Sequence, residues 1–215
     1  MQCLFHLAST YARAIRYITL FLGCLVLQAQ NGATHNDWPY HGGTQHAWRY
    51  SDLNQINTSN VKSLAPAWGF QTGDYENGLQ SPPIVIDGVL YLGTSRDQIF
   101  ALDAATGKLI WQYNYPPGTG GQNKGVAVGA GKVFMGTHDD YVVALDQKTG
   151  KEVWKTAMDD ATQCGCRIIS APLFLKDKVV VGNAGGEWCI PRLPDSAGRQ
   201  YRPCGVALLY HSGAW

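Results

Sequence analysis

The sequence predicts an all-β fold built from repeated four-stranded antiparallel units, and two observations support this prediction. The segment Ala101–Trp111 returns as Ala144–Trp154 at a constant offset of 43 residues. The composition is rich in glycine (25 residues), tyrosine (11) and tryptophan (7), which suits short strands and tight turns better than helices. A period of about 40–50 residues without helical patterning is typical of propeller blades. We therefore expect an incomplete β-propeller.

The N-terminal residues differ in character from the rest of the chain. Arg13 and Arg16 precede an apolar run, Tyr17–Leu27, which is shorter than the ~20 residues that a membrane-spanning helix needs. This pattern is typical of a secretory signal, with a cleavage site at Leu27-Gln28-Ala29. We expect residues 1–29 to be a signal peptide and the protein to be periplasmic. Lipid attachment at Cys24 and an uncleaved anchor are the alternatives.

The first repeat reads as four strands in order. Asp87-Gly88 lies between two apolar runs and predicts a tight hairpin, because glycine supplies the positive φ that such a turn needs. The expected strands of this repeat are Ile84–Ile86, Val89–Leu92, Gln98–Leu102 and Leu109–Trp111.

The second repeat follows the same plan, and a third begins after it. The expected strands are Val126–Val128, Lys132–Met135, Tyr141–Leu145 and Glu152–Trp154, then Ala171–Leu175 and Val179–Gly182. No third copy of the tryptophan segment follows. Residues 30–190 are therefore expected to hold about two and a half blades, fewer than the four to eight of a closed ring.

The recurring polar and aromatic residues are expected to be scaffold. Asp103 and Asp146 can bond backbone donors of the turn that follows each of them. Trp111 and Trp154 offer a flat face that can pack between blades, with an indole N–H available to a carbonyl group.

Charge and cysteine content exclude some functions and leave others open. A net charge of +1 with 15% charged residues and no basic stripe argues against nucleic acid as a partner. Without the signal, four cysteines remain (Cys164, Cys166, Cys189 and Cys204), and they allow three pairings. The histidines show no ligand spacing and are expected at the surface or in turns: His35, His41, His46 and His138.

The segment before the first repeat carries the most specific motifs. It contains Asp37-Trp38-Pro39, Arg49-Tyr50-Ser51 and Leu53–Asn57, and Gly185-Gly186-Glu187 follows the last expected strand. With the two tryptophan segments, these motifs resemble the start of the pyrroloquinoline quinone (PQQ) dependent methanol/ethanol dehydrogenase family. The resemblance covers residues 37–187.

The resemblance implies an eight-bladed propeller that holds PQQ and a Ca²⁺ or lanthanide ion. Such an enzyme oxidises alcohols and passes electrons to cytochrome c or a membrane quinone. Glu187 stands where the family has a metal-ligating glutamate, and Gly185 and Gly186 stand at positions that line the cofactor. The resemblance places no catalytic residue here, since the aspartate base is expected beyond the C-terminus.

Other cofactor-binding positions depart from the family pattern. Gln80 stands where many members have a glutamate, Lys124 replaces an arginine and Ile169 replaces a threonine. Gly118-Thr119 occupy the positions of an adjacent cysteine pair. Lysine keeps the charge but loses the planar fork of arginine. These departures favour an alternative function, a non-catalytic propeller scaffold that binds other proteins.

Residues 191–215 do not match the family, and we hypothesise that they are read in a shifted frame. Codons for Leu209–Trp215 can be chosen so that the next frame encodes Tyr-Thr-Ile-Pro-Gly-Pro, which resembles the family sequence after the third blade. The chain would then be an N-terminal fragment, expected to be inactive alone.

Overall fold

The computed structural model describes residues 37–75, 77–116, 120–185 and 206–210. These residues belong to one compact unit that spans residues 36–215. The expected signal peptide, together with Gly186 and Glu187, lies outside the described residues. Within the described part, no helix is long and apolar enough to cross a membrane.

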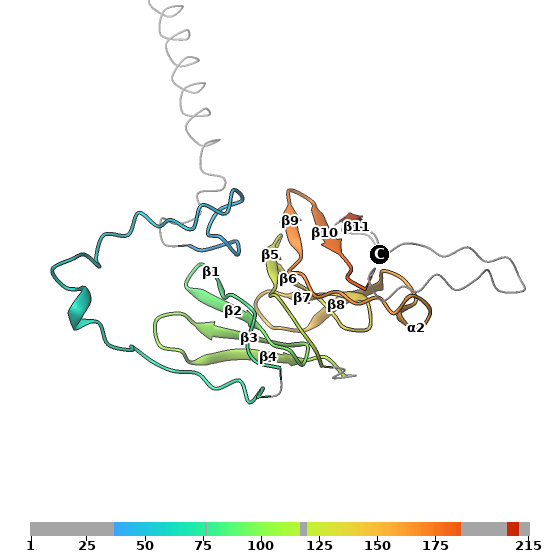
Figure 1. The fold of residues 1–215 in the computed structure, drawn as a ribbon, viewed down its shortest axis with the longest axis horizontal. Coiled ribbons are helices and arrows are strands. Elements are labelled where there is room, and N and C mark those ends of the chain that lie inside the picture. The colour runs from blue at the N-terminus through green and yellow to red at the C-terminus, as the bar shows by residue number, and fades with distance from the viewer. Residues whose placement is uncertain (1–36, 76, 117–119, 186–205, 211–215) are drawn as a thin grey trace, which may run out of the picture. The chain divides into compact units, whose positions relative to one another are not determined.

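Two four-stranded antiparallel sheets correspond to the two full repeats and confirm the predicted blades (Figure 1). The first sheet has the order β1-β2-β3-β4, with strands β1 (Ile84–Ile86), β2 (Val89–Gly93), β3 (Gln98–Asp103) and β4 (Leu109–Asn114). The second has the order β5-β6-β7-β8, with strands β5 (Ala127–Gly129), β6 (Lys132–Gly136), β7 (Tyr141–Asp146) and β8 (Glu152–Ala157). Most strands run one to three residues past the expected ends.

The hairpin turns follow from their residues. Asp87 and Gly88 have φ values of 50° and 74°, and they join Ile86 to its partner Val89. Two successive positive φ angles give the tight turn whose twist matches the flanking strands. Ala130 and Gly131 repeat this geometry in the second sheet, with φ values of 47° and 70°.

Asp103 and Asp146 organise the turns between the third and fourth strands, as predicted. Oδ1 of Asp103 accepts hydrogen bonds from the Thr106 backbone N (2.8 Å) and hydroxyl (2.6 Å). Asp146 accepts the same pair from Thr149, at 2.8 Å and 2.7 Å. Hydrogen bonds to the charged carboxylate, chiefly from the threonine hydroxyls, lower the pKa of both aspartates.

Tryptophan side chains connect successive blades through an indole hydrogen bond and through packing of the ring over a glycine. The Trp111 indole N–H donates to the Gln147 carbonyl (3.0 Å), and its ring lies directly over Gly150. Trp68 does the same one blade earlier, with its N–H on the Ala104 carbonyl (3.1 Å) and its ring over Gly107. The 43-residue series therefore begins at Trp68, in the opening segment, where the strand pattern gave no sign of a repeat.

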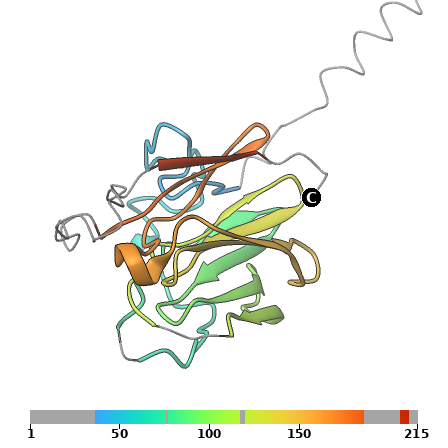
Figure 2. The same cartoon turned by 90° about the vertical axis from the view of Figure 1, so that its right-hand side faces the viewer.

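The third sheet has three strands in the described residues, in the order β11-β10-β9 (Figure 2). Its strands are β9 (Leu173–Leu175), β10 (Lys178–Gly182) and β11 (Val206–Tyr210). Strand β11 comes from the segment 191–215, which was expected to lack the family pattern. A short helix, α2 (Ala161–Cys164), precedes this sheet, and a 3₁₀ turn, η1 (Val61–Ser63), lies in the opening segment. Cys166 is disulfide-bonded.

The core consists of two apolar layers between successive sheets. One layer joins Tyr91 and Trp111 of the first sheet to Met135 and Leu145 of the second. The other joins Phe134 and Val142, among others, to side chains that include Ile168, Val179 and Val181. Residues of the first strands of the three sheets, Ile84 of β1, Val128 of β5 and Leu173 of β9, line one pocket near the candidate site.

Candidate functional site

Three predicted site residues lie just before the first strands of three successive blades. Gln80, Lys124 and Ile169 each stand a few residues before the first strand of a blade. The Lys124 ammonium donates a hydrogen bond to Oε1 of Gln80, and the Lys124 backbone N donates to the Ile169 carbonyl (2.9 Å). The structure thus brings these three residues together. Lys124 and Gln80 are exposed, so a ligand can reach both side chains.

Buried polar residues that sequence reasoning missed hold this loop in place. Oδ1 of Asn123 accepts from the Gly125 backbone N (2.8 Å), and its amide N–H donates to the Gly136 carbonyl (3.3 Å). The Ser81 hydroxyl accepts from the Gly93 backbone N (3.2 Å). Asn123 and Ser81 are 3% and 6% exposed, so their hydrogen bonds replace water that the backbone has lost. The available signal for these two residues was their place in the sequence, since Asn123 is next to Lys124 and Ser81 is next to Gln80.

Gly185 lies against Gly165 and Cys166, in the chain segment before β9. Its φ is 120°, and a Cβ placed on it would lie 2.8 Å from the Gly165 carbonyl oxygen. Backbone hydrogen bonds between Arg167 and Ala184 (2.7 and 3.0 Å) hold the two segments together. A close approach of the chain to itself therefore requires glycine here, and cofactor contact by Gly185 stays a prediction. Gly186 and Glu187 are outside the described residues.

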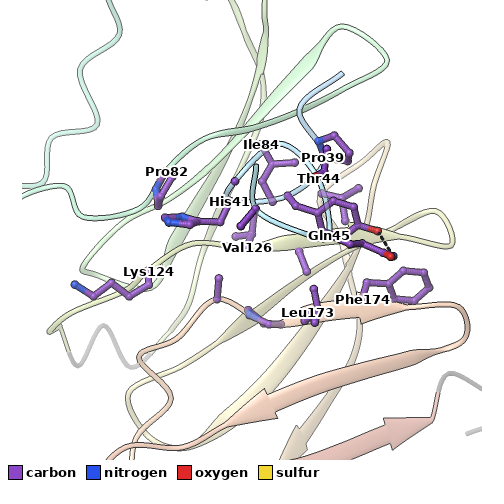
Figure 3. Close-up of a pocket in the computed structure, with 17 residues that line it drawn as sticks. Pro39, His41, Thr44, Gln45, Pro82, Ile84, Lys124, Val126, Leu173 and Phe174 are labelled. Carbon is purple, nitrogen blue, oxygen red and sulfur yellow. Dashed lines mark hydrogen bonds between the residues drawn. The ribbon is translucent and has the colours of Figure 1, made fainter. Parts of the chain in front are cut away.

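A pocket of about 210 Å³ adjoins Lys124 and is bordered by β1, β5 and β9 (Figure 3). Lys124 lies at one end of it and Phe174 at the other, with His41 between them. Most of its wall is apolar, including Ile84, Val126 and Leu173. No group of three or more potential metal-ligating side chains occurs among the residues that the structure describes.

His138 meets the expectation of a turn residue and adds a feature that the sequence did not show. It lies in a turn, as predicted, but its side chain is only 5% exposed and contacts the carboxylate of Asp97. The sequence alone could not reveal this burial, because the covering residues come from a different blade.

Four-stranded sheets that pack face to face and are joined by tryptophan contacts define this chain as part of a β-propeller. Lys124 and Gln80 lie together just before the first strands of two of its blades. The family model described as "Glucose/ethanol/alcohol dehydrogenase, beta-propeller domain" (PQQ) matches residues 38–199. The chain belongs to this family of PQQ-dependent oxidoreductases. The match includes the first residues of the segment 191–215.

Known relatives agree with this assignment. The chain is 38% identical over 186 residues to the 1-butanol dehydrogenase (cytochrome c) of Thauera butanivorans, covering 82% of this chain and 26% of that protein. The solved quinohemoprotein alcohol dehydrogenase ADHIIG of Pseudomonas putida HK5 superposes with a TM-score of 0.71 at 33% identity, over 82% of this chain and 25% of that one.

A europium-containing methanol dehydrogenase superposes with a TM-score of 0.64 at 37% identity, over 71% of this chain and 28% of that structure. The chain thus spans about a quarter of the length of the relatives named here.

Proposed function

We propose that this chain is the N-terminal part of a periplasmic dehydrogenase that uses PQQ to oxidise alcohols to aldehydes. Electrons would pass to a cytochrome or a quinone, the two acceptors that appear in the names of relatives from Thauera butanivorans and Gluconobacter oxydans. The observation that carries the proposal is the meeting of Gln80, Lys124 and Ile169 just before the first strands of three successive blades.

The residues present fit an anionic planar cofactor. PQQ carries carboxylate groups, and the Lys124 ammonium is an exposed cation whose described side-chain partner is the neutral amide of Gln80. An ammonium can attract a carboxylate without the two-pronged geometry that arginine offers. The anchored Lys124 backbone fixes where this charge is presented.

The bound cofactor would supply the chemistry of two-electron oxidation, and this chain would supply part of its binding site. Lys124 would hold a carboxylate, and Gln80 would orient the ammonium. Glu187 is the proposed ligand of a Ca²⁺ or lanthanide ion, a hard cation that prefers oxygen donors. The proposal assigns no catalytic residue to the chain, so we expect the 215-residue product to bind without turning over alcohols.

Binding of PQQ to the 215-residue chain tests this proposal, with Ca²⁺ present and tryptophan fluorescence or calorimetry as the readout. Lys124→Met should weaken binding by roughly tenfold, since it removes one charge-assisted contact of about 1.4 kcal/mol. Lys124→Arg should bind at least as tightly as the parent chain. Lys148→Met, which removes an exposed lysine from the β7–β8 turn, is the matched control and should change nothing.

A protein-binding scaffold without PQQ is the second candidate, because the Lys124 ammonium already has a partner within the chain. Failure of the parent chain to bind PQQ, together with failure of the longer gene product, would favour the scaffold. Sequencing the gene past codon 190 defines that longer product. A shifted open frame with further tryptophan segments would support the dehydrogenase.

A further inference from the structure

Asp97 and His138 form a buried polar pair between the first two blades. Asp97 is fully buried in the turn between β2 and β3, and His138 lies in the equivalent turn between β6 and β7. The His138 backbone N donates to Oδ2 of Asp97 (3.1 Å), and the ring Nδ1 lies 3.1 Å from Oδ1. This double contact fixes the orientation of the imidazole ring.

The far edge of that ring supports the loop that leads to Lys124. A Cβ added to Gly121 would lie 2.2 Å from Nε2 and 2.4 Å from Cδ2 of His138, so the Gly121 backbone rests directly on the imidazole. Nε2 is buried and has no hydrogen-bond partner among the described residues, so this edge of the ring acts through packing. The Gly121 backbone N also donates to the Ser95 carbonyl (2.7 Å), which ties the loop to the turn that holds Asp97.

Lys124 follows Gly121 by three residues, and the chain between them is anchored. Asn123 bonds the Gly136 carbonyl, and the Lys124 N bonds the Ile169 carbonyl. A shift of Gly121 would therefore be transmitted to Lys124 over a short and constrained path. The Lys124 backbone itself is held by one hydrogen bond, from its N–H to the carbonyl of Ile169, which precedes the first strand of the third blade.

We propose that Asp97 and His138 are positioning residues. They fix the position of the Gly121–Lys124 loop and thereby the position at which the Lys124 ammonium contacts an anionic cofactor. The cofactor part of this inference rests on the proposed function. The positioning part concerns the chain alone and can be measured without any ligand.

A pair of variants tests the packing contact. Gly121 does not have a positive φ, so Gly121→Ala introduces a clash with His138 and no backbone strain. We expect Gly121→Ala to weaken PQQ binding roughly tenfold and to speed hydrogen exchange at the Lys124 amide by a similar factor. His138→Ala removes the ring that supports Gly121 and should speed Lys124 exchange and weaken PQQ binding by similar factors. Adding His138→Ala to Gly121→Ala should cause little further loss, because both changes act on the same contact.

Two references separate positioning from loss of structure. The Val143 amide, in the buried centre of β7, should exchange at the same rate in Gly121→Ala as in the parent chain. Gly69→Ala, at a glycine with open space around it, should leave Lys124 exchange and PQQ binding unchanged.

Unchanged Lys124 exchange in Gly121→Ala or in His138→Ala would overturn the proposal, as would losses that simply add in the double variant. If no variant, parent chain included, binds PQQ, the proposed function fails. The exchange rates at Lys124 then still decide whether His138 positions the loop.

Discussion

Asp97 and Asp140 occupy the same position in two successive turns, 43 residues apart, but their carboxylates have different surroundings. Both are fully buried, with φ values of 55° and 65°. Both Asp97 oxygens contact His138. Oδ2 of Asp140 accepts from the Asn183 amide (3.1 Å), whereas Oδ1 has no partner among the described residues. Burial, the main cause, raises the pKa of Asp140, and the nearby charge of Asp159 raises it further.

These surroundings predict opposite effects for the same substitution. A carboxyl whose pKa is raised in the folded state favours folding below its ordinary pKa of 3.8, and this contribution is lost as the pH rises through the raised value. Asp140→Asn should therefore stabilise the protein by about 1 kcal/mol at pH 7, and its advantage should disappear at about pH 3. Asp97→Asn should destabilise it by about 1–2 kcal/mol, because a charged acceptor of two hydrogen bonds is lost.

Urea denaturation at both pH values measures these changes. Asparagine tolerates a positive φ, so backbone strain does not enter the comparison. A loss of stability in Asp140→Asn at pH 7 would contradict the assignment of an unfavourable buried charge.

At the scale of the element, the sequence predicted what depends on local turns and missed what depends on neighbouring blades. Asp87-Gly88 and the paired Asp103 and Asp146 turns need only nearby residues, and they were placed correctly. The blade contact of Trp68 and the burial of His138 depend on residues at least 36 positions away. Helix α2 is a single turn capped by the Asp160 side chain, too short for apolar periodicity to reveal it.

For the candidate site too, the sequence predicted some of the residues and missed others. Gln80, Lys124 and Ile169 were found because the family resemblance marks their positions. Asn123 and Ser81 serve only to bond backbone groups, and such roles leave no chemical signature in a sequence.

The tryptophan contact predicts how two similar glycines differ. Gly150 and Gly131 have nearly equal φ values, 69° and 70°, so alanine meets the same backbone strain of about 1 kcal/mol at each. A Cβ on Gly150 would also lie 2.6 Å from the Trp111 ring, whereas open space surrounds Gly131. We expect Gly150→Ala to cost about 3 kcal/mol and Gly131→Ala about 1 kcal/mol in urea denaturation. Equal losses would show that the ring moves aside freely.

At the scale of the whole molecule, the outer strands β4 and β8 are sheet edges in the described part of the chain. Ile110 and Val153, at equivalent positions, are about half exposed. Strand β8 carries Glu152 and Lys155, but β4 (Leu109–Asn114) has no charged residue. Natural proteins often place charged side chains on edge strands, because an uncharged edge can pair with a strand of another chain. We therefore expect β4 to pair with another chain more readily than β8 does.

This difference predicts which substitution improves solution behaviour. Ile110→Lys should reduce self-association of the 215-residue chain, because it places the first charge on the β4 edge. Val153→Lys should have a smaller effect, since charges on both sides of Val153 already protect β8. Neither change touches the buried Trp111 or the Lys124 loop, so folding and ligand binding serve as controls. Light scattering across a concentration series measures the outcome, and an equal response of the two variants would mean that chains associate through another surface, such as the exposed Trp48 and Tyr50.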